Sequence, residues 1–567
     1  MTSSVSPILS VTDLTVSFGS TIPVKGVSFE LTAGEKVGLV GESGSGKSLT
    51  ALSIMRLVKN ANTGGAVSLA GENLLDLPER DMAKVRGGKI SMVYQDPMSS
   101  LNPMQTIGHQ LVEAIRLHEK ISVADARQRA LTLLEEVGVS YPEERLDQYP
   151  HEFSGGMCQR VMIAMAMSAR PQVLIADEPT TALDVTTQAR IIDLLDRLAE
   201  EYGTAVILIT HDLGVAAGFC ERIHVMREGR IVESAEAEDL YFRPQHDYTK
   251  KLLGAVVDLT TDITAPIPTG NDKSPTPVLV ERGNTSDSAA LEPLVRVVGL
   301  KKSYKLGNGR VINAVDDVSF TINRGETFGL VGESGSGKST VSKAVLALTS
   351  VDGGDVKFDS HNLHELHGSD LRTLRRQMQM VFQDPYSALN RRQTVADIIE
   401  APLLAHRLGS RASRREQVME MIDLVGLTAE FATRKPRTLS GGQSQRVAIA
   451  RALVLKPDFL VLDESVSALD VSIQAQILNL LRRLQTELGL TYLFISHDLA
   501  VIRYMANQVA VMQKGQIVEQ ATRDQLFSDP SHDYTKTLMA AIPIADPTKE
   551  RERRKNAAEL AAKLGEN

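Results

Sequence analysis

The sequence predicts two tandem copies of one α/β domain. Each copy should have a mixed, largely parallel core sheet, a β-rich part and a helical part. Three observations predict this fold class: an internal repeat along the chain, short apolar strands that alternate with helical stretches, and a phosphate-loop motif in each copy. The composition agrees, because 43% hydrophobic and 23% charged residues are ordinary for a globular protein.

The repeat is visible in segments that recur in the same order, 286 to 291 residues apart. In chain order they are GLVGESGSGKS (38–48 and 329–339), YQDPMSSLNP and FQDPYSALNR (94–103 and 382–391), FSGGMCQR and LSGGQSQR (153–160 and 439–446), ITHDL and ISHDL (209–213 and 495–499), and HDYTK (246–250 and 532–536). Such regular spacing indicates two copies of a domain of about 250 residues.

The domain boundaries follow from the ends of the repeat. We expect a first domain over residues 1–257, a flexible linker over 258–290, a second domain over 291–545 and a tail over 546–567. The linker stretch is rich in Pro, Thr, Ser and Asp and has no apolar period. The tail carries several arginines before an Ala-rich segment, which predicts a solvated helix.

Each copy contains a G-x-x-x-x-G-K-S loop between a strand-like and a helix-like stretch, which is the context that a phosphate-binding loop needs. Glycines let backbone N–H groups turn toward phosphate oxygens, and the following helix adds partial positive charge. The lysine should reach the β- and γ-phosphates and the serine should bind Mg²⁺. The residues are Gly41, Glu42, Ser43, Gly44, Ser45, Gly46, Lys47 and Ser48 in the first copy, and Gly332, Glu333, Ser334, Gly335, Ser336, Gly337, Lys338 and Ser339 in the second.

Polar side chains at the ends of later strands complete the predicted chemistry. Apolar strands at 173–176 and 459–462 end in Asp177-Glu178 and Asp463-Glu464. The aspartates should hold Mg²⁺ and the glutamates should position or deprotonate the attacking water. Further candidates for Mg²⁺, water or γ-phosphate contact are Gln95, Gln383, His211 and His497.

A second pair of glycine segments precedes helical stretches at 159–167 and 445–453. They are Ser154-Gly155-Gly156 and Ser440-Gly441-Gly442. A helix N-cap accounts for the serine alone. Two adjacent glycines indicate that the backbone approaches another group closely, and a helix start is suited to bind an anion.

Together, the phosphate loop, glutamine, SGG segment, acidic pair, ALD segment and histidine resemble the ATP-binding cassette (ABC) ATPases. The resemblance implies two ATP molecules bound head to tail, each between the phosphate loop of one copy and the SGG segment of the other. Site one would combine Gly41–Ser48, Gln95, Asp177, Glu178 and His211 with Ser440, Gly441, Gly442 and Gln443; site two would combine Gly332–Ser339, Gln383, Asp463, Glu464 and His497 with Ser154, Gly155, Gly156 and Met157. Phe18 and Tyr304 would stack on adenine, with core packing as the rival role of Phe18.

The segments around SGG and the acidic pair are most similar to the paired ATPase subunits of oligopeptide, dipeptide and nickel importers, fused into one chain. Three features depart from that pattern. Met157 stands where the signature has Gln, Ser465-Val466 replace Pro-Thr, and no cysteine after Cys220 is present for an iron–sulfur loop. Because each copy keeps its lysine, acidic pair and histidine, we expect two sites that hydrolyse ATP.

The resemblance implies partners that the chain itself does not contain. We expect two membrane-spanning permease subunits, an extracytoplasmic solute-binding protein and a peripheral location on the cytoplasmic face of the inner membrane. No apolar run reaches the roughly 18 residues that span a bilayer. The candidates for permease docking, with local packing as the alternative, are Met98, Leu101, Met104, Tyr386 and Leu389.

Two other functions stay open at this stage. One is the ATPase of an exporter, and the other is a soluble twin-cassette ATPase that acts on ribosomes or DNA. The net charge of −8 argues against a chain whose main role is to grip nucleic acid, so no nucleic-acid partner is expected. Cys158 and Cys220 are expected to be buried core residues.

Overall fold

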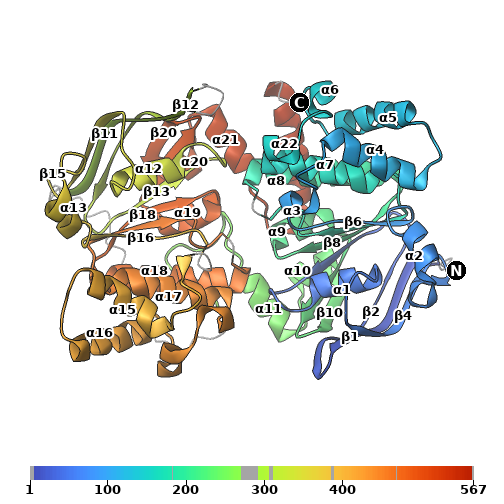
Figure 1. Ribbon diagram of the computed structural model, residues 1–567, viewed down its shortest axis with the longest axis horizontal. Coiled ribbons are helices and arrows are strands. Elements are labelled where there is room, and N and C mark those ends of the chain that lie inside the picture. The colour runs from blue at the N-terminus through green and yellow to red at the C-terminus, as the bar shows by residue number, and fades with distance from the viewer. Residues whose placement is uncertain are drawn as a thin grey trace. The chain divides into compact units, whose positions relative to one another are not determined.

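The computed structural model describes residues 6–181, 183–269, 292–305, 311–384, 388–467 and 469–564. The chain divides into two compact units (Figure 1). The first comprises Met1–Val256 with Pro543–Asn567, and the second comprises Val257–Ile542.

The first unit is organised around a six-stranded sheet in the order β10-β9-β3-β8-β7-β6. All neighbouring pairs are parallel except β9–β10, so the sheet is mixed as expected. The strands are β3 (Lys36–Val40), β6 (Ile90–Val93), β7 (Val173–Asp177), β8 (Ala205–Thr210), β9 (Arg222–Arg227) and β10 (Arg230–Glu236). Every residue of β7 and β8 is buried, as continuous apolar runs require when both faces of a parallel sheet are covered.

A four-stranded antiparallel sheet forms the β-rich part, in the order β2-β1-β4-β5. Its strands are β1 (Leu9–Phe18), β2 (Thr21–Leu31), β4 (Asn62–Leu69) and β5 (Glu72–Asn73). Side chains of β1, β2 and β4 share one apolar core with helix α1 (Lys47–Ile54) and with one face of the parallel sheet. This core therefore supports the loop that joins β3 to α1.

Helices cover the other face of the parallel sheet. The helices of the first unit are α1, α2 (Glu79–Val85), α3 (Pro97–Ser100), α4 (Ile107–His118), α5 (Val123–Glu136), α6 (Pro142–Arg145), α7 (Gly155–Met167), α8 (Val185–Tyr202), α9 (Leu213–Phe219), α10 (Ala237–Phe242), α11 (Asp247–Gly254) and α22 (Pro547–Leu564). Helix α7 begins four residues earlier than expected, because Ser154 caps it by accepting a hydrogen bond from the Met157 N–H at 3.3 Å.

The second unit repeats both sheets, in the orders β16-β17-β18-β13-β19-β20 and β12-β11-β14-β15. Its strands are β11 (Pro293–Lys305), β12 (Val311–Asn323), β13 (Thr327–Val331), β14 (Gly353–Phe358), β15 (His361–Asn362), β16 (Met378–Val381), β17 (Phe459–Asp463), β18 (Thr491–Ser496), β19 (Gln508–Gln513) and β20 (Gln516–Thr522). Its helices are α12 (Lys338–Val345), α13 (Gly368–Leu374), α15 (Val395–Ala405), α16 (Arg411–Leu424), α17 (Gly441–Leu453), α18 (Val471–Leu488), α19 (Leu499–Met505), α20 (Arg523–Ser528) and α21 (Asp533–Ala540). The predicted tandem α/β fold is thereby confirmed.

The C-terminal tail is helical as expected, but one face of this helix packs on the rest of the first unit, which corrects the expectation of a solvated helix. Glu550 of α22 is only 2% exposed, and α22 packs on α9 of the first unit. A Cβ on Gly218 would lie 2.4 Å from the Glu550 side chain, so the two helices meet closely where α9 has a glycine. Alternating charge in a sequence cannot distinguish an exposed helix from one whose arginines find carboxylates on a neighbour.

The start of the expected linker also makes contacts. Residues 258–269 belong to the second unit, whereas residues 270–290 lie outside the described part of the chain. The Asn479 side chain on α18 accepts from the Ile267 N–H at 3.1 Å and donates to the Ile267 carbonyl at 2.8 Å. Within residues 258–269 these hydrogen bonds involve only the backbone of Ile267, so they leave no apolar pattern in the sequence.

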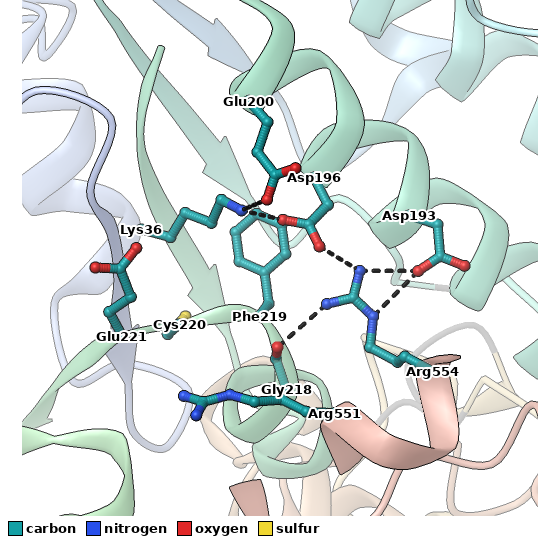
Figure 2. A pocket seen from close by; sticks show the side chains of 10 residues that line it. All are labelled: Lys36, Asp193, Asp196, Glu200, Gly218, Phe219, Cys220, Glu221, Arg551 and Arg554. Carbon is teal, nitrogen blue, oxygen red and sulfur yellow. Dashed lines mark hydrogen bonds and ion pairs between the residues drawn. The ribbon is translucent and has the colours of Figure 1, made fainter. Parts of the chain in front are cut away.

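A polar pocket of about 650 Å³ lies within the first unit, between α22 and the rest of that unit (Figure 2). Lys36 and Glu221 stand at the N-terminal ends of β3 and β9, which is the end of the sheet opposite to the phosphate loop. Its lining is Lys36, Asp193, Asp196, Glu200, Gly218, Phe219, Cys220, Glu221, Arg551 and Arg554. Most of these charges pair with one another: Asp196 bonds both Lys36 and Arg554.

Both cysteines are free and buried in the first unit, as expected. Within the described ranges, no helix is both long and apolar enough to cross a membrane.

Candidate functional site

The phosphate loops follow β3 and β13 and end at the first residues of α1 and α12. Their glycines are required sterically. Gly41 has φ 148°, and a Cβ there would lie 2.2 Å from the Met226 carbonyl oxygen. Gly332 repeats this against Met512 at 2.1 Å. Each loop is therefore pressed against the neighbouring strand, in a backbone conformation that glycine adopts without strain and that phosphate-binding loops use.

The loop lysines are buried and point back into the loop. The Lys47 ammonium donates to the carbonyl oxygens of Gly41 at 2.8 Å and Glu42 at 3.0 Å. Lys338 donates to Gly332 and Glu333, both at 2.7 Å. A cation held within a ring of N–H groups is suited to bind the phosphates of a nucleotide.

The loop serine and the aspartate meet in both copies. The Ser48 hydroxyl donates to Asp177 at 2.9 Å, and Ser339 donates to Asp463 at 3.3 Å. Burial, and secondly the charge of Glu178, raise the pKa of Asp177 to about 6. A buried carboxylate beside a hydroxyl would be stabilised by a cation, so these residues fit Mg²⁺, which binds few protein groups when phosphate supplies the others.

A glutamine, a glutamate and a histidine converge from three neighbouring strands. Gln95 donates to the Glu178 carboxylate at 2.7 Å, and the His211 Nδ1 lies 3.5 Å from the same carboxylate. In the second copy, Gln383 donates to Glu464 at 2.6 Å and the His497 Nδ1 lies at 3.7 Å. The strands β6, β7 and β8 are parallel, so their carboxyl ends bring these side chains to one edge.

The pKa of Glu178 is low although the group is buried. Burial alone would raise it, but contacts with His211 and Thr181 outweigh burial and bring the pKa to about 2. The His497 contact likewise lowers the pKa of Glu464. Both glutamates are therefore ionised at neutral pH and can accept a proton. Thr181, whose hydroxyl donates to Glu178 at 2.9 Å, was not predicted; its counterpart Ser467 bonds the Glu464 backbone instead.

The SGG segments form the N-termini of α7 and α17. A Cβ on Gly156 would lie 2.8 Å from Thr187, and one on Gly442 would lie 2.4 Å from Ile473. The second glycine of each segment is thus required by packing inside its own unit. A Cβ on Gly155 would meet nothing within 4 Å, so in the first unit packing requires only the second glycine of the segment.

The remaining candidates differ in exposure. Phe18 is 38% and Tyr304 42% exposed, so neither is a core residue and both can offer a ring face. Among the docking candidates, Met98 and Met104 are exposed. Leu101 and Leu389 are each only 2% exposed, which favours the alternative of local packing over docking for these two residues. Tyr386, Ala182 and Ala468 lie outside the described residues.

The HDYTK repeat contains two tyrosines, Tyr248 and Tyr534, for which the sequence predicted no role. The Tyr248 hydroxyl accepts a hydrogen bond from the Glu42 N–H in the first phosphate loop, and Tyr534 does the same for Glu333. The repetition of the motif was the available signal, but only the fold brings α11 and α21 to the loops.

Comparison with known proteins identifies two matching families. The ABC transporter model matches residues 24–181 and 315–467. The model of the oligopeptide/dipeptide transporter C-terminal region matches residues 232–279 and 518–566. Both families therefore match twice, in agreement with the repeat.

Among the curated relatives are proteins named glutathione import ATP-binding protein GsiA. The one from Salmonella choleraesuis is 45% identical, with 96% of this chain and 91% of the relative covered. The one from Pectobacterium atrosepticum is also 45% identical, over 93% and 87%. The one from Escherichia coli is 44% identical, over 96% and 91%. With both cassette motifs, the two family matches and full-length relatives in agreement, the chain belongs to the ATP-binding subunits of the ABC transporter family, which are ATPases that power transport.

Proposed function

We propose that this chain is the ATPase of an importer for small peptides, with glutathione, itself a tripeptide, among the candidate solutes. The repeated oligopeptide/dipeptide C-terminal region and the names of the relatives support this solute class. The observation that carries the ATPase role is that each unit holds a complete set of lysine, Ser–Asp pair and Gln–Glu–His cluster.

In each site, the loop lysine binds the nucleotide phosphates and the ionised glutamate accepts the proton of the attacking water. The histidine and glutamine keep that carboxylate in place. Mg²⁺ would be held by Ser48, Gln95 and Asp177, and by Ser339, Gln383 and Asp463. When bound, it neutralises charge that develops on the phosphates.

The two sites are proposed to be shared head to tail, so that Ser154, Gly155 and Gly156 serve the nucleotide on the second loop, and Ser440, Gly441, Gly442 and Gln443 serve the one on the first. The position of Ser154, Gly155 and Gly156 at the N-terminus of α7 supports this, because a helix N-terminus is suited to bind an anion. Phe18 and Tyr304 would stack on adenine.

Two permease subunits and a solute-binding protein complete the proposed transporter, with this chain at the cytoplasmic face of the membrane. The exposed Met98 and Met104 lie in the segment that follows Gln95, and they offer adaptable apolar contacts to a permease helix.

Transport into proteoliposomes tests the proposal. The chain is reconstituted with its cognate permeases and binding protein, and uptake of labelled glutathione and of a dipeptide is measured with ATP on the cytoplasmic side. We expect uptake that Lys47→Ala/Lys338→Ala abolishes. ATP-driven efflux would instead identify an exporter, and ATPase stimulation by ribosomes or DNA would identify the soluble alternative.

A further inference from the structure

The HDYTK motif has a defined local structure in both units. His246 caps α11 by accepting from the Tyr248 N–H at 3.1 Å, and His532 caps α21 in the same way at 3.1 Å. This cap turns the tyrosine ring toward the phosphate loop. The Tyr248 hydroxyl then accepts from the Glu42 N–H at 3.2 Å, and the Tyr534 hydroxyl accepts from the Glu333 N–H at 3.1 Å.

Hydrogen bonds to the core sheet hold the start of the motif in place. On β10, Glu233 accepts hydrogen bonds from the N–H groups of Gln245 at 2.7 Å and His246 at 3.0 Å. On β20, Glu519 accepts from Ser531 at 2.7 Å and His532 at 3.1 Å. The tyrosine hydroxyl is therefore presented from a fixed position against which the loop can be held.

The peptide bond that each tyrosine contacts also contacts the lysine. The Gly41 carbonyl and the Glu42 N–H belong to one planar trans peptide unit, so they point in opposite directions. The Lys47 ammonium donates to that carbonyl at 2.8 Å, while Tyr248 accepts from the N–H. In the second loop, Lys338 and Tyr534 hold the Gly332–Glu333 peptide in the same way.

We propose that Tyr248 and Tyr534 are positioning residues of the two ATP sites, which fix the orientation of the first peptide of each phosphate loop and, through it, the lysine that binds phosphate. The proposal rests on the proposed ATP-binding role of these loops. It assigns a role in ATP binding to the C-terminal region of each cassette, whose helix carries the tyrosine.

The test removes only the hydroxyls, in the full-length variant Tyr248→Phe/Tyr534→Phe. The matched control is Tyr202→Phe, which removes a hydroxyl that donates to Glu136 at 2.7 Å, away from the loops. We expect the KM for ATP and the Kd for Mg-ATP to rise about fivefold in the double variant, because one hydrogen bond to the loop is lost. We expect kcat to stay within about twofold, because the residues around Glu178 and Glu464 are unchanged.

Melting without nucleotide distinguishes positioning from general stability. The double variant should melt within about 2 °C of Tyr202→Phe, yet gain less in melting temperature on addition of Mg-ATP. Wild-type KM and Kd in the double variant would overturn the proposal, and so would a loss of ATP affinity matched by Tyr202→Phe. Absence of ATP binding in the wild-type chain would instead refute the proposed function itself.

Discussion

The two cassettes agree at the carboxyl ends of their parallel strands and differ at the opposite ends. The glutamine–glutamate contact is 2.7 Å in one and 2.6 Å in the other, and the tyrosine–loop bond is 3.2 Å and 3.1 Å. At the opposite end, however, Asp193 and Asp196 of α8 correspond to Asn479 and Arg482 of α18.

This difference matches what covers each surface. The acidic α8 receives Arg554 of α22, which donates to Asp193 at 2.8 Å and Asp196 at 2.6 Å. Helix α18 receives an extended segment instead, and Arg482 donates to the Ile263 carbonyl at 2.8 Å. Residues at the carboxyl ends of the strands carry the same predicted chemistry in both cassettes and are therefore alike. Residues at the opposite ends carry no such chemistry, so they can differ and bind a different part of the chain in each unit.

Replacement of the two glutamates tests the equivalence of the two sites and should change activity most. Glu178→Gln/Glu464→Gln should lower ATP hydrolysis about 100-fold or more, because each loses its proton acceptor. Each single variant should cost a similar share of activity, since the two clusters have matching contacts. Phosphate release under saturating Mg-ATP measures this. Wild-type activity in Glu178→Gln together with none in Glu464→Gln would show that only the second site works.

The next effect tests the specialised end of the first unit. Arg554→Ala should destabilise α22 docking by about 2 kcal/mol, because it leaves partly buried Asp196 with one cationic partner fewer. Arg551→Ala is the matched control, since its 3.4 Å contact with Glu238 is exposed on both sides and should contribute little.

Alkylation of Cys220 measures the undocking of α22. Cys220 lines the pocket under α22 and is 1% exposed, so its alkylation rate, followed by mass spectrometry, reports undocking of the helix. Alkylation should accelerate about 30-fold in Arg554→Ala and remain unchanged in Arg551→Ala. Equal rates in all three proteins would show that Arg554 does not hold the helix.

A smaller effect concerns acid stability. Burial lowers the pKa of His224 on β9 to about 4, whereas the corresponding residue of β19 is Ala510. Between pH 6.5 and 4 the unfolded chain binds a proton at this position that the folded chain does not, so stability falls as the pH falls through this window. From pH 6.5 to 5, the wild-type should lose about 1.5 kcal/mol more free energy of unfolding than His224→Ala. Urea unfolding at each pH, detected by thiol labelling of the first unit, measures the difference. Parallel pH profiles would contradict it.

The smallest effect concerns the helix caps. In the second unit, Ser440 and Gln443 form a capping box in which the Gln443 side chain accepts from the Ser440 N–H at 3.0 Å. Met157 cannot form this bond in the first unit. Met157→Gln should therefore stabilise the first unit by about 0.5 kcal/mol, and Gln443→Met should destabilise the second by a similar amount. Differential scanning calorimetry measures the melting temperature of both variants. If Met157→Gln is destabilising, the packing of the Met157 thioether contributes more to stability than a capping hydrogen bond from a glutamine.

Structural features that depend on residues close together in the sequence were easier to predict than features that depend on distant residues. Helix α5 has its determinants close together in the sequence, because its apolar period and its Ser122 cap are local. The loops, acidic pairs, glutamines and histidines were predicted because each follows a strand, and parallel strands end at one edge. The sequence did not decide between docking and local packing for Leu101 and Leu389, since an apolar residue in a loop has the same sequence signature whether it faces a partner or its own core.

The duplication and the fold class follow from the sequence alone, which also predicts the residues of the two proposed ATP sites, because the motifs at the strand ends are short and contiguous. Only the tertiary structure decided that α22 packs on the first unit, that residues 258–269 pack on the second, and that Tyr248 and Tyr534 hold the phosphate loops. These contacts join residues about 200 or more positions apart, and their partners are backbone groups or single charges. Such groups occur everywhere in a chain, so only folding selects which of them meet.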